Sequence, residues 1–421
     1  MLASLVLGCA PGTTSLDLPA HAATPNVLVV SIDTLRADHV SAYGGRVDTP
    51  HLDGLLTAGI FFEDLRSCTN FTFGASACAM AGVDPIDDAF LPIGAGDPSY
   101  DEVPQDAPLL FRKLGKRGYA MALVTANSVL SRHNGYLPRG AEEVQLGYVD
   151  AAVVAEEGLA QLDELMAGDA PWALQLHFMD PHLPYELPEA YVEGEDELPR
   201  VPRWTMTGRP GIEAVVAAYE AGEVELEVLE AAMTQVAFYY AASVRYLDDQ
   251  LGVLVGELEA RGALDDTLVV VWSDHGEGFY EHEAVIHHTS LHGEQTLVVG
   301  SVSHPELAPR TVSGPRGLAS IYDTIAEVMG WRTSARDPSI RFAHSATTDG
   351  IQHSVERDGL RLLVDVDGSA ELYDLASDPT EAHDLLADRT ADAAELWSLL
   401  EPRAEAACRL QPELPYAVPE L

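Results

Sequence analysis

The sequence predicts an α/β fold, in which a large sheet is flanked by helices and a small α+β subdomain follows. Two observations predict the sheet: continuous apolar runs bounded by turn signals are typical of buried parallel strands, and helical patterns lie between these runs. A third observation predicts the subdomain, because the pattern changes near residue 330 to short strands and one helix. With 421 residues, 47% of them hydrophobic, the chain can bury a large core.

The predicted strands and helices alternate along the chain. The strands cover residues 26–33 (NVLVVSID), 119–125 (YAMALVT), 172–180 (WALQLHFMD) and 267–274 (TLVVVWSD). The main helical patterns cover residues 50–59, 107–118 and 212–261. This strand–helix–strand order is typical of a doubly wound sheet.

Three of these strands end in an aspartate: Asp33, Asp180 and Asp274. In open α/β sheets, ligands bind in the crevice outside the carboxyl ends of the strands. The three aspartates therefore predict where the chemistry takes place.

The domain organisation follows from the shifts in pattern. Residues 1–24 are predicted to be a secretion or lipoprotein leader with a linker, and residues 25–332 the catalytic domain. Residues 333–421 are predicted to form a C-terminal subdomain of two or three antiparallel strands and a covering helix at about 391–407.

The first residues, MLASLVLGCAPG, are apolar over too short a stretch to span a bilayer. They resemble the end of a secretion signal, and VLGC resembles the lipobox of bacterial lipoproteins, in which the cysteine is acylated. We therefore expect export to the periplasm or cell surface, with Cys9 as the lipid attachment site. The alternative is a frayed tail with an isolated cysteine.

The charge balance excludes one class of partner. The chain carries 24 Lys and Arg against 67 Asp and Glu, a net charge of −43, and such a surface repels nucleic acid. The simplest reason for this acidity is solubility. The four cysteines show no CxxC spacing, and Cys68 and Cys78 can pair in an oxidising compartment.

The stretch SDHGEGFYEHE (273–283) carries the strongest chemical signal. Asp274 and His275 end a strand and offer two metal ligands on a turn that Gly276 lets approach closely. Asp33 ends another strand at the same crevice. A hydroxyl at Thr72 completes the set, since a divalent ion lowers the pKa of such a hydroxyl and lets it attack an anionic ester.

Several longer motifs together resemble the sulfatase family, within the alkaline phosphatase superfamily. They are VVSIDTLRADHVSAYGG, TPHLDGLLTAGIFFED, MDPHLPY, SDHGEGFYEH and ELYDLASDPTEAHDLL, in the family's order from about residue 26 to residue 386. The resemblance implies an alkaline-phosphatase-like sandwich with a large mixed sheet and a smaller C-terminal domain.

The resemblance also implies site roles. Asp33, Asp274 and His275 match metal ligands, His182 a histidine that contacts the ester group, and His287 a residue that faces the leaving-group oxygen. Hard oxygen ligands favour Ca²⁺ or Mg²⁺, with Ca²⁺ the first expectation, whereas imidazole admits Zn²⁺ or Mn²⁺. Counting back from Gly82, which matches the glycine of the family's TG, places the nucleophile at Thr72.

The sequence departs from the family at three points. Sulfatases carry a C/S-x-P-S-R motif and oxidise its first residue to formylglycine, but TFGAS begins with a threonine, which cannot follow that route. Members of the superfamily with a threonine nucleophile act mainly on phosphate and phosphonate esters. Thr34 replaces the second aspartate of an Asp-Asp pair, and in place of a lysine-bearing GKWH segment the chain offers Asn127 or His133.

Three functions remain open. The first is a metal-dependent hydrolase of sulfate or phosphate esters, acting on a glycan or small molecule. The second is a transferase that moves the same group to an alcohol of the cell envelope. The third is a non-catalytic descendant that binds an anionic glycan, which a pocket short of cationic groups would favour. Arg36 and Asp38 are expected to brace the loop after Asp33, and His51, His177 and His304 to be structural or exposed.

Overall fold

The structure is a computed structural model that describes residue 16 and residues 24–83, 107–332, 337, 339–347, 350–410 and 417–419. The predicted leader, including Cys9, lies outside the described residues apart from residues 16 and 24. None of the helices within these ranges has the length and apolar character that a bilayer crossing requires.

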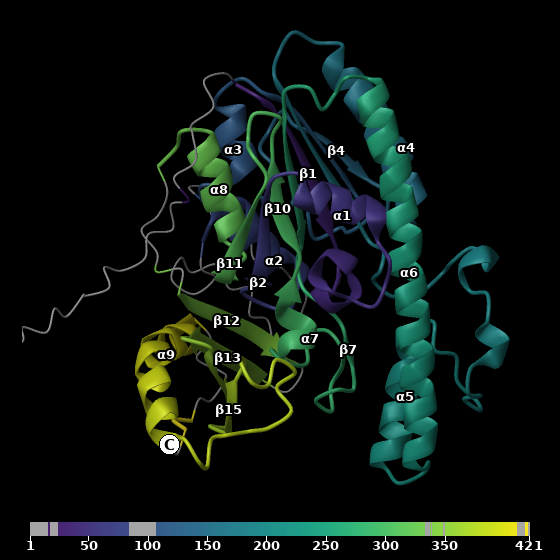
Figure 1. The fold of residues 1–421 in the computed structure, drawn as a ribbon, viewed down its shortest axis with the longest axis vertical. Coiled ribbons are helices and arrows are strands. Elements are labelled where there is room, and N and C mark those ends of the chain that lie inside the picture. Colours follow the sequence, from purple (N-terminus) through teal and green to yellow (C-terminus); the bar gives the residue numbers. More distant parts are fainter. Residues whose placement is uncertain are drawn as a thin grey trace, which may run out of the picture.

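A nine-stranded mixed sheet forms the centre of the molecule (Figure 1). Its order is β11-β2-β10-β6-β1-β5-β3-β4, with β9 also pairing with β2. The strands β6, β1, β5, β3 and β4 are parallel neighbours, whereas β10 runs antiparallel to β6 and β2. Their bounds are β1 Asn26–Ile32, β2 Ile60–Arg66, β3 Ala120–Thr125, β4 Glu142–Gln145, β5 Trp172–Phe178, β6 Thr267–Ser273, β9 Leu297–Val298, β10 Gly300–Ser303 and β11 Arg310–Gly317.

Helices cover both faces because alternate residues of a buried strand point to opposite sides. Leu28 and Val30 of β1 belong to a core shared with α1, α4, α5 and α6, whereas Val27 and Val29 pack with α2, α3 and α8. The helices are α1 Pro50–Thr57, α2 Thr72–Ala81, α3 Leu110–Gly115, α4 Ala151–Met166, α5 Arg209–Glu220, α6 Leu226–Ala260, α7 Gly293–Thr296 and α8 Ser320–Val328. The four apolar runs are thus confirmed as strands, and the stretch 212–261 contains two helices rather than one.

The C-terminal part forms a separate antiparallel sheet of four strands, one or two more than expected. The strands are β12 Ile340–Thr347, β13 Gly350–Arg357, β14 Leu360–Asp365 and β15 Ala370–Asp374, covered by helix α9 Thr390–Leu410. Strands β12 and β13 are not among the predicted strands, and neither are β2, β4, β9, β10 and β11 of the central sheet. The predicted boundary between residues 332 and 333 stays a prediction.

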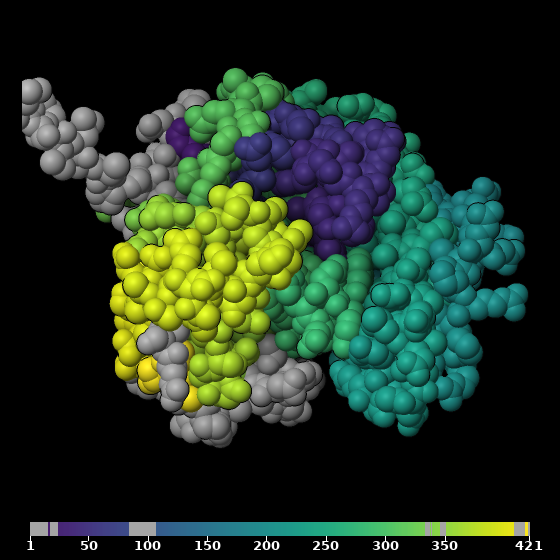
Figure 2. Space-filling view, turned by 60° about the horizontal axis from the view of Figure 1, so that its bottom comes forward, coloured from purple at the N-terminus to yellow at the C-terminus, as the bar shows by residue number. Residues whose placement is uncertain are grey.

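Figure 2 shows the C-terminal subdomain (yellow) on one side of the segment around the short hairpin of β7 Gly278–Phe279 and β8 Val285–Ile286 (green). Helices α5 and α6 (teal) lie on its other side. The histidine-rich stretch of the sequence therefore lies between the C-terminal subdomain and helices α5 and α6, and contacts with both can fix its loops.

Candidate functional site

The predicted site residues converge at the carboxyl ends of the parallel strands. Asp33 follows β1, Asp274 follows β6, and Asn127 lies two residues after the end of β3. Thr72 is the first residue of α2, which begins just beyond these ends. Two of the three predicted aspartates, Asp33 and Asp274, thus meet where four segments converge, whereas Asp180 is bonded to Ser243 and the N–H of Ala151.

Three potential ligand atoms face one another in a fully buried setting. His275 Nε2 lies 3.8 Å from Asp33 Oδ1 and 3.7 Å from Asp274 Oδ2, and all three side chains are fully buried. Within the described part of the chain, none of these three atoms has a hydrogen-bond partner. Buried polar atoms are normally satisfied, so this trio fits a divalent cation that would bind all three.

The electrostatics of the two carboxylates also favour a bound cation. Burial alone would raise the pKa of Asp33, but the hydrogen bond from His177 and the nearby histidine charges lower it. Burial, and then the negative charge of Asp33, raise the pKa of Asp274 well above its usual value. Two buried carboxylates this close repel each other when both are ionised, and a cation between them would remove that cost.

Local backbone interactions fix this pair of loops. Asp274 Oδ1 accepts hydrogen bonds from the backbone N–H groups of Thr34, at 3.0 Å, and of His275, at 2.7 Å. The other oxygen, Oδ2, therefore stays available to a cation. A Cβ at Gly276 would lie 2.1 Å from the carbonyl oxygen of Glu294, so glycine is required where the turn passes that backbone.

Thr72 lies beside the trio. Its hydroxyl is 3.3 Å from Asp33 Oδ2, and Asn127 Nδ2 is 2.9 Å from the same oxygen and 3.4 Å from the Thr72 hydroxyl. As the first residue of α2, Thr72 sits at the positive end of a helix dipole, which favours negative charge on its oxygen. A disulfide between Cys68 and Cys78 joins the segment before Thr72 to the helix, and the predicted pairing of these cysteines is confirmed.

A cavity of about 440 Å³ opens over Thr72. His182 and His287 line it, with ring centroids 5.0 Å apart, and His287 is 4.7 Å from the ring of His275. No lysine or arginine is among its described lining residues, which are Phe71, Thr72, Phe73, Asn127, Ser128, Val129, Asn134, Tyr148, His182, His287 and His288. Its cationic character therefore depends on histidine, on the helix terminus, on any bound cation and on Arg209, which lies outside the lining but whose charge acts on His287 and His288.

The surroundings of the two predicted catalytic histidines disfavour their charged forms. Burial lowers the pKa of His287 well below its usual value, and the neighbouring charges of His275, His288 and His182 lower it further. Burial also lowers the pKa of His182, which Asp33 only partly offsets. His287 Nδ1 is 2.9 Å from Glu277 Oε1, a contact that fixes the ring so that its other nitrogen is directed away from Glu277.

The structure defines the surroundings of His177 and distinguishes between Asn127 and His133, the two candidates for the missing lysine. His177, which sequence reasoning treated as structural or exposed, is fully buried with its Nε2 only 3.3 Å from Asp33 Oδ2. Its place near the end of β5, a strand that pairs with β1, was the signal that could have identified it. Of the two candidates for the missing lysine, Asn127 lies at the site and His133 is exposed outside the cavity lining.

Arg36 and Asp38 brace the loop after Asp33, as expected. The Arg36 guanidinium, 4% exposed as a residue, contacts Asp38 at 2.9 Å, the carbonyl oxygen of Glu277 at 2.8 Å and Glu281 at 2.7 Å. This arginine therefore ties the β1 loop to the histidine-rich stretch and is fully engaged by its partners.

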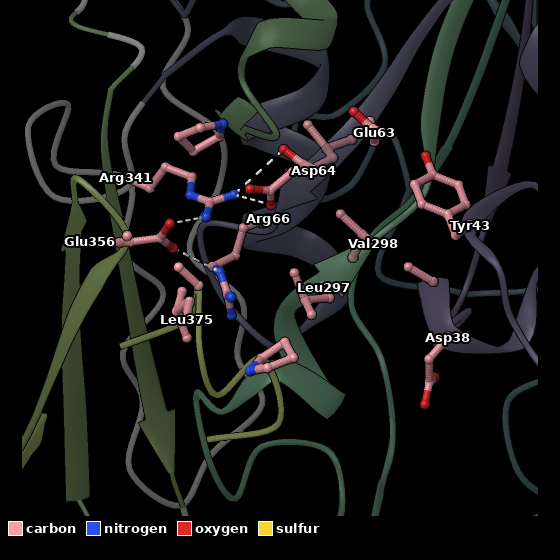
Figure 3. A pocket seen from close by; sticks show the side chains of 16 residues that line it. Asp38, Tyr43, Glu63, Asp64, Arg66, Leu297, Val298, Arg341, Glu356 and Leu375 are labelled. Carbon is pink, nitrogen blue, oxygen red and sulfur yellow. Dashed lines mark hydrogen bonds and ion pairs between the residues drawn. The ribbon is translucent and has the colours of Figure 1, made fainter. Parts of the chain in front are cut away.

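A second cavity, of about 450 Å³, lies between the main sheet and the C-terminal subdomain (Figure 3). Four of its charged residues form ion pairs: Arg341 contacts Asp64 at 2.5 Å and Arg66 contacts Glu356 at 3.2 Å. These ion pairs join β2 to β12 and β13, so we interpret this cavity as part of the subdomain interface.

Comparisons with known proteins identify the family of this chain. The family model described as Sulfatase matches residues 25–331. The human N-sulphoglucosamine sulphohydrolase is 23% identical over 299 residues, covering 68% of this chain and 56% of that protein. The choline-sulfatase of Rhizobium meliloti is 25% identical over 194 residues, covering 44% of this chain and 37% of that protein. The chain thus spans about half the length, or less, of these curated relatives.

Solved structures show the same fold. One, a protein in complex with its substrate D-glucosamine-2-N,6-O-disulfate, has a TM-score of 0.72 at 16% identity, covering 92% of this chain and 99% of that one. The phosphonate monoester hydrolase of Agrobacterium radiobacter has a TM-score of 0.66 at 19% identity, covering 92% and 96%. With the family match over residues 25–331, the conclusion is that this chain belongs to the sulfatase family, within the alkaline phosphatase superfamily.

Proposed function

We propose that this chain is a metal-dependent hydrolase of sulfate or phosphate esters in which Thr72 is the nucleophile. The observation that carries the proposal is the position of the Thr72 hydroxyl, 3.3 Å from Asp33 Oδ2 and beside three buried ligand atoms that lack hydrogen-bond partners among the described residues. When bound by Asp33, Asp274 and His275, a divalent ion would lower the pKa of the hydroxyl and offset the charge of the ester.

The chain's own residues supply the remaining steps. Thr72 Oγ1 attacks the sulfur or phosphorus atom while its proton is drawn toward Asp33 Oδ2, and the bond from that atom to the alcohol oxygen breaks. Asn127 Nδ2 steadies the charge on Thr72 and Asp33. His287 faces the departing oxygen and His182 contacts the ester group. The departing oxygen takes its proton from solvent water, and the proton that Thr72 gives up passes from Asp33 to solvent.

A threonine nucleophile decides how the intermediate is cleared. The ester on Thr72 cannot collapse to an aldehyde, so water must attack sulfur or phosphorus and release inorganic sulfate or phosphate with free Thr72. This route favours phosphate esters as substrates, whereas the similarity to the sulfatase family favours sulfate esters. Several relatives are named for glycan substrates, and we propose an anionic ester of a glycan or small molecule as the substrate class here.

One feature supports a non-catalytic alternative. The cavity lining within the described residues contains no lysine or arginine, although an anionic ester would benefit from one. In that case the protein would keep the fold and bind an anionic glycan without turnover. The envelope transferase remains a variant of the hydrolase in which an alcohol replaces water in the last step.

We also propose export, for which the disulfide between buried Cys68 and Cys78 is the structural support, because such bonds persist in oxidising compartments. Lipid attachment at Cys9 stays a prediction of the sequence.

The deciding experiment combines metal analysis with initial rates on nitrophenyl sulfate, phosphate and phosphodiester substrates. Wild type is compared with Thr72→Ala and with the control Thr69→Val, a buried position of the same segment outside the cavity lining. Bound metal and a rate that requires Thr72 but not Thr69 would establish the esterase, and the preferred substrate would choose between sulfur and phosphorus. Bound metal with no rate on any substrate would favour the binding protein.

A further inference from the structure

His177 is the one buried histidine at the site to which the family resemblance assigns no role. It lies inside β5, is fully buried, and places Nε2 3.3 Å from Asp33 Oδ2. One ligand atom each from Asp33, His177 and Asp274 lie within 4.8 Å of one another. The ring therefore faces both carboxylates, in a position from which it can share a cation with them.

The hydrogen bonds behind the ring are compatible with a proton on either ring nitrogen. Ser31 Oγ lies 2.9 Å from His177 Nδ1, 3.0 Å from Gln175 Nε2 and 3.3 Å from the carbonyl oxygen of Leu176. When a cation takes the electron pair of His177 Nε2, the ring proton is on Nδ1. Ser31 Oγ then accepts from the amide of Gln175 and from His177 Nδ1–H, and its own hydroxyl donates to the carbonyl of Leu176.

In that state His177 Nε2 offers its electron pair to the cation, whereas without a cation Nε2–H donates to Asp33 Oδ2. The rest of the chain of contacts is consistent with the cation-bound state, since Gln175 Oε1 accepts from the hydroxyl of Tyr136 at 3.1 Å. An electron pair on Nε2 that faces Asp33 Oδ2 is unfavourable unless a cation lies between them. The remote nitrogen of a metal-binding histidine typically donates to such an oxygen partner, and Ser31 Oγ provides it here.

The kinds of atoms at the site also bear on which ion it holds. Ca²⁺ takes six to eight oxygen ligands and Mg²⁺ demands nearly ideal octahedral oxygens. Here the second carboxylate of the family's aspartate pair is Thr34, and one oxygen of Asp274 is occupied by two backbone N–H groups. Two carboxylates, two imidazoles and one hydroxyl form a set that suits a borderline transition ion.

We propose that His177 is a further ligand of the metal, and that the site selects an ion that accepts imidazole nitrogen, Zn²⁺ before Ca²⁺. The inference rests on the metal site of the proposed function, and it replaces Ca²⁺ as the first expectation from the sequence. His177 and His275 then bind from two different strands, β5 and the end of β6, on either side of β1.

X-ray absorption at the zinc edge tests the ligand directly. The full chain is stripped with a chelator, reloaded with one equivalent of Zn²⁺ and measured without substrate. We expect two imidazoles bound to zinc in wild type and one in His177→Gln. One imidazole in wild type would overturn the proposal, and His177 would then be only a hydrogen-bonding neighbour of Asp33. This measurement on wild type does not depend on whether the variant folds.

Titration calorimetry of the stripped protein tests the selectivity. We expect Zn²⁺ to bind at least about 100-fold more tightly than Ca²⁺, and His177→Gln to weaken Zn²⁺ binding by about tenfold or more while Ca²⁺ binding changes little. The matched control is His304→Gln, another buried histidine, which contacts Asp266 before β6 at the opposite end of the sheet. Tighter binding of Ca²⁺ would also overturn the proposal.

The two proposals fail separately. If X-ray absorption finds one imidazole and turnover requires Thr72, the proposed hydrolase is supported and the role of His177 as a ligand is refuted. If it finds two imidazoles but no ester is turned over, the role of His177 as a ligand is supported and the proposed hydrolase is refuted.

Discussion

The hydroxyl of Thr72 lies 3.3 Å from Oδ2 of Asp33, although 39 positions separate the two residues. The contact exists because β1 ends at Ile32 and α2 begins at Thr72, so that a strand terminus and a helix terminus meet. The positive end of the helix dipole and the carboxylate act on the hydroxyl from two sides. This pair is the centre of the predictions below.

Removing the Thr72 hydroxyl tests the nucleophile. We expect Thr72→Ala to lower kcat by about 10³-fold or more, because the attacking oxygen is lost. Metal content should be unchanged, since Asp33, Asp274 and His275 remain. Thr72→Ser, which keeps a hydroxyl, should retain a measurable part of the rate. Unchanged turnover in Thr72→Ala would mean that water attacks the ester directly.

Asp274 tests the metal site. We expect Asp274→Ala to abolish both metal binding and any turnover, because it removes one of three buried ligand atoms. Elemental analysis after gel filtration measures the first effect and initial rates the second. Asp180→Asn is a suitable control, since Asp180 is a half-buried carboxylate bonded to Ser243 and the N–H of Ala151 instead. Retained turnover in Asp274→Ala would contradict the site assignment.

Asn127 tests how the charge of the nucleophile is steadied. Its amide contacts both Asp33 and Thr72, so we expect Asn127→Ala to reduce kcat by about 10²-fold, in the range of a lost oxyanion contact. The effect on KM should be smaller, because the contact strengthens as charge develops. Asn134→Ala, at the same cavity, is the control. An equal loss in both variants would argue for a merely structural role of Asn127.

The disulfide between Cys68 and Cys78 should stabilise the segment that carries Thr72. We expect the double variant Cys68→Ser, Cys78→Ala to lower the free energy of unfolding by roughly 2–3 kcal/mol, as for a short closed loop. Urea denaturation monitored by circular dichroism measures this change. Reductant should produce a similar loss in wild type and none in the variant, and a stability insensitive to reductant would contradict the prediction.

His282 should make stability depend on pH above neutrality. Burial alone would lower its pKa, but the hydrogen bond and charge of Glu294, and the carbonyl of Glu381, raise the pKa to about 9. Since the folded pKa exceeds the unfolded value of about 6.5, the protonated ring stabilises the fold fully below about pH 6.5. That contribution is lost as the pH rises through 9.

Thermal denaturation from pH 6 to pH 10 measures this dependence. The Tm of wild type should fall across the window, and that of His282→Gln should fall less. Because His282 and His292 stack with centroids 3.8 Å apart, and His292 contacts Glu371 of the C-terminal subdomain, the loss should loosen that subdomain. Parallel curves for wild type and variant would refute the assignment.

The sequence by itself determined four of the nine strands of the central sheet and the three aspartates that follow them. Long apolar runs such as 172–178 leave no alternative to burial, and a strand that ends in a polar residue places that residue at the edge of the sheet. The pairing of Cys68 with Cys78 was also within reach, because the two residues are only ten positions apart. The metal and nucleophile roles came from the match of whole motifs to a family.

Only the tertiary structure decided which histidines and amides reach the site. His177 lies in a predicted strand and His133 does not, but only the pairing of β5 with β1 shows that His177 contacts Asp33, and only the fold shows that His133 is exposed. Asn127 reaches Thr72 because β3 ends beside β5, a relation between segments that no local pattern encodes. Local periodicity fixes which way a side chain faces within its own strand or helix, whereas the partners of that side chain depend on the order of the strands in the sheet.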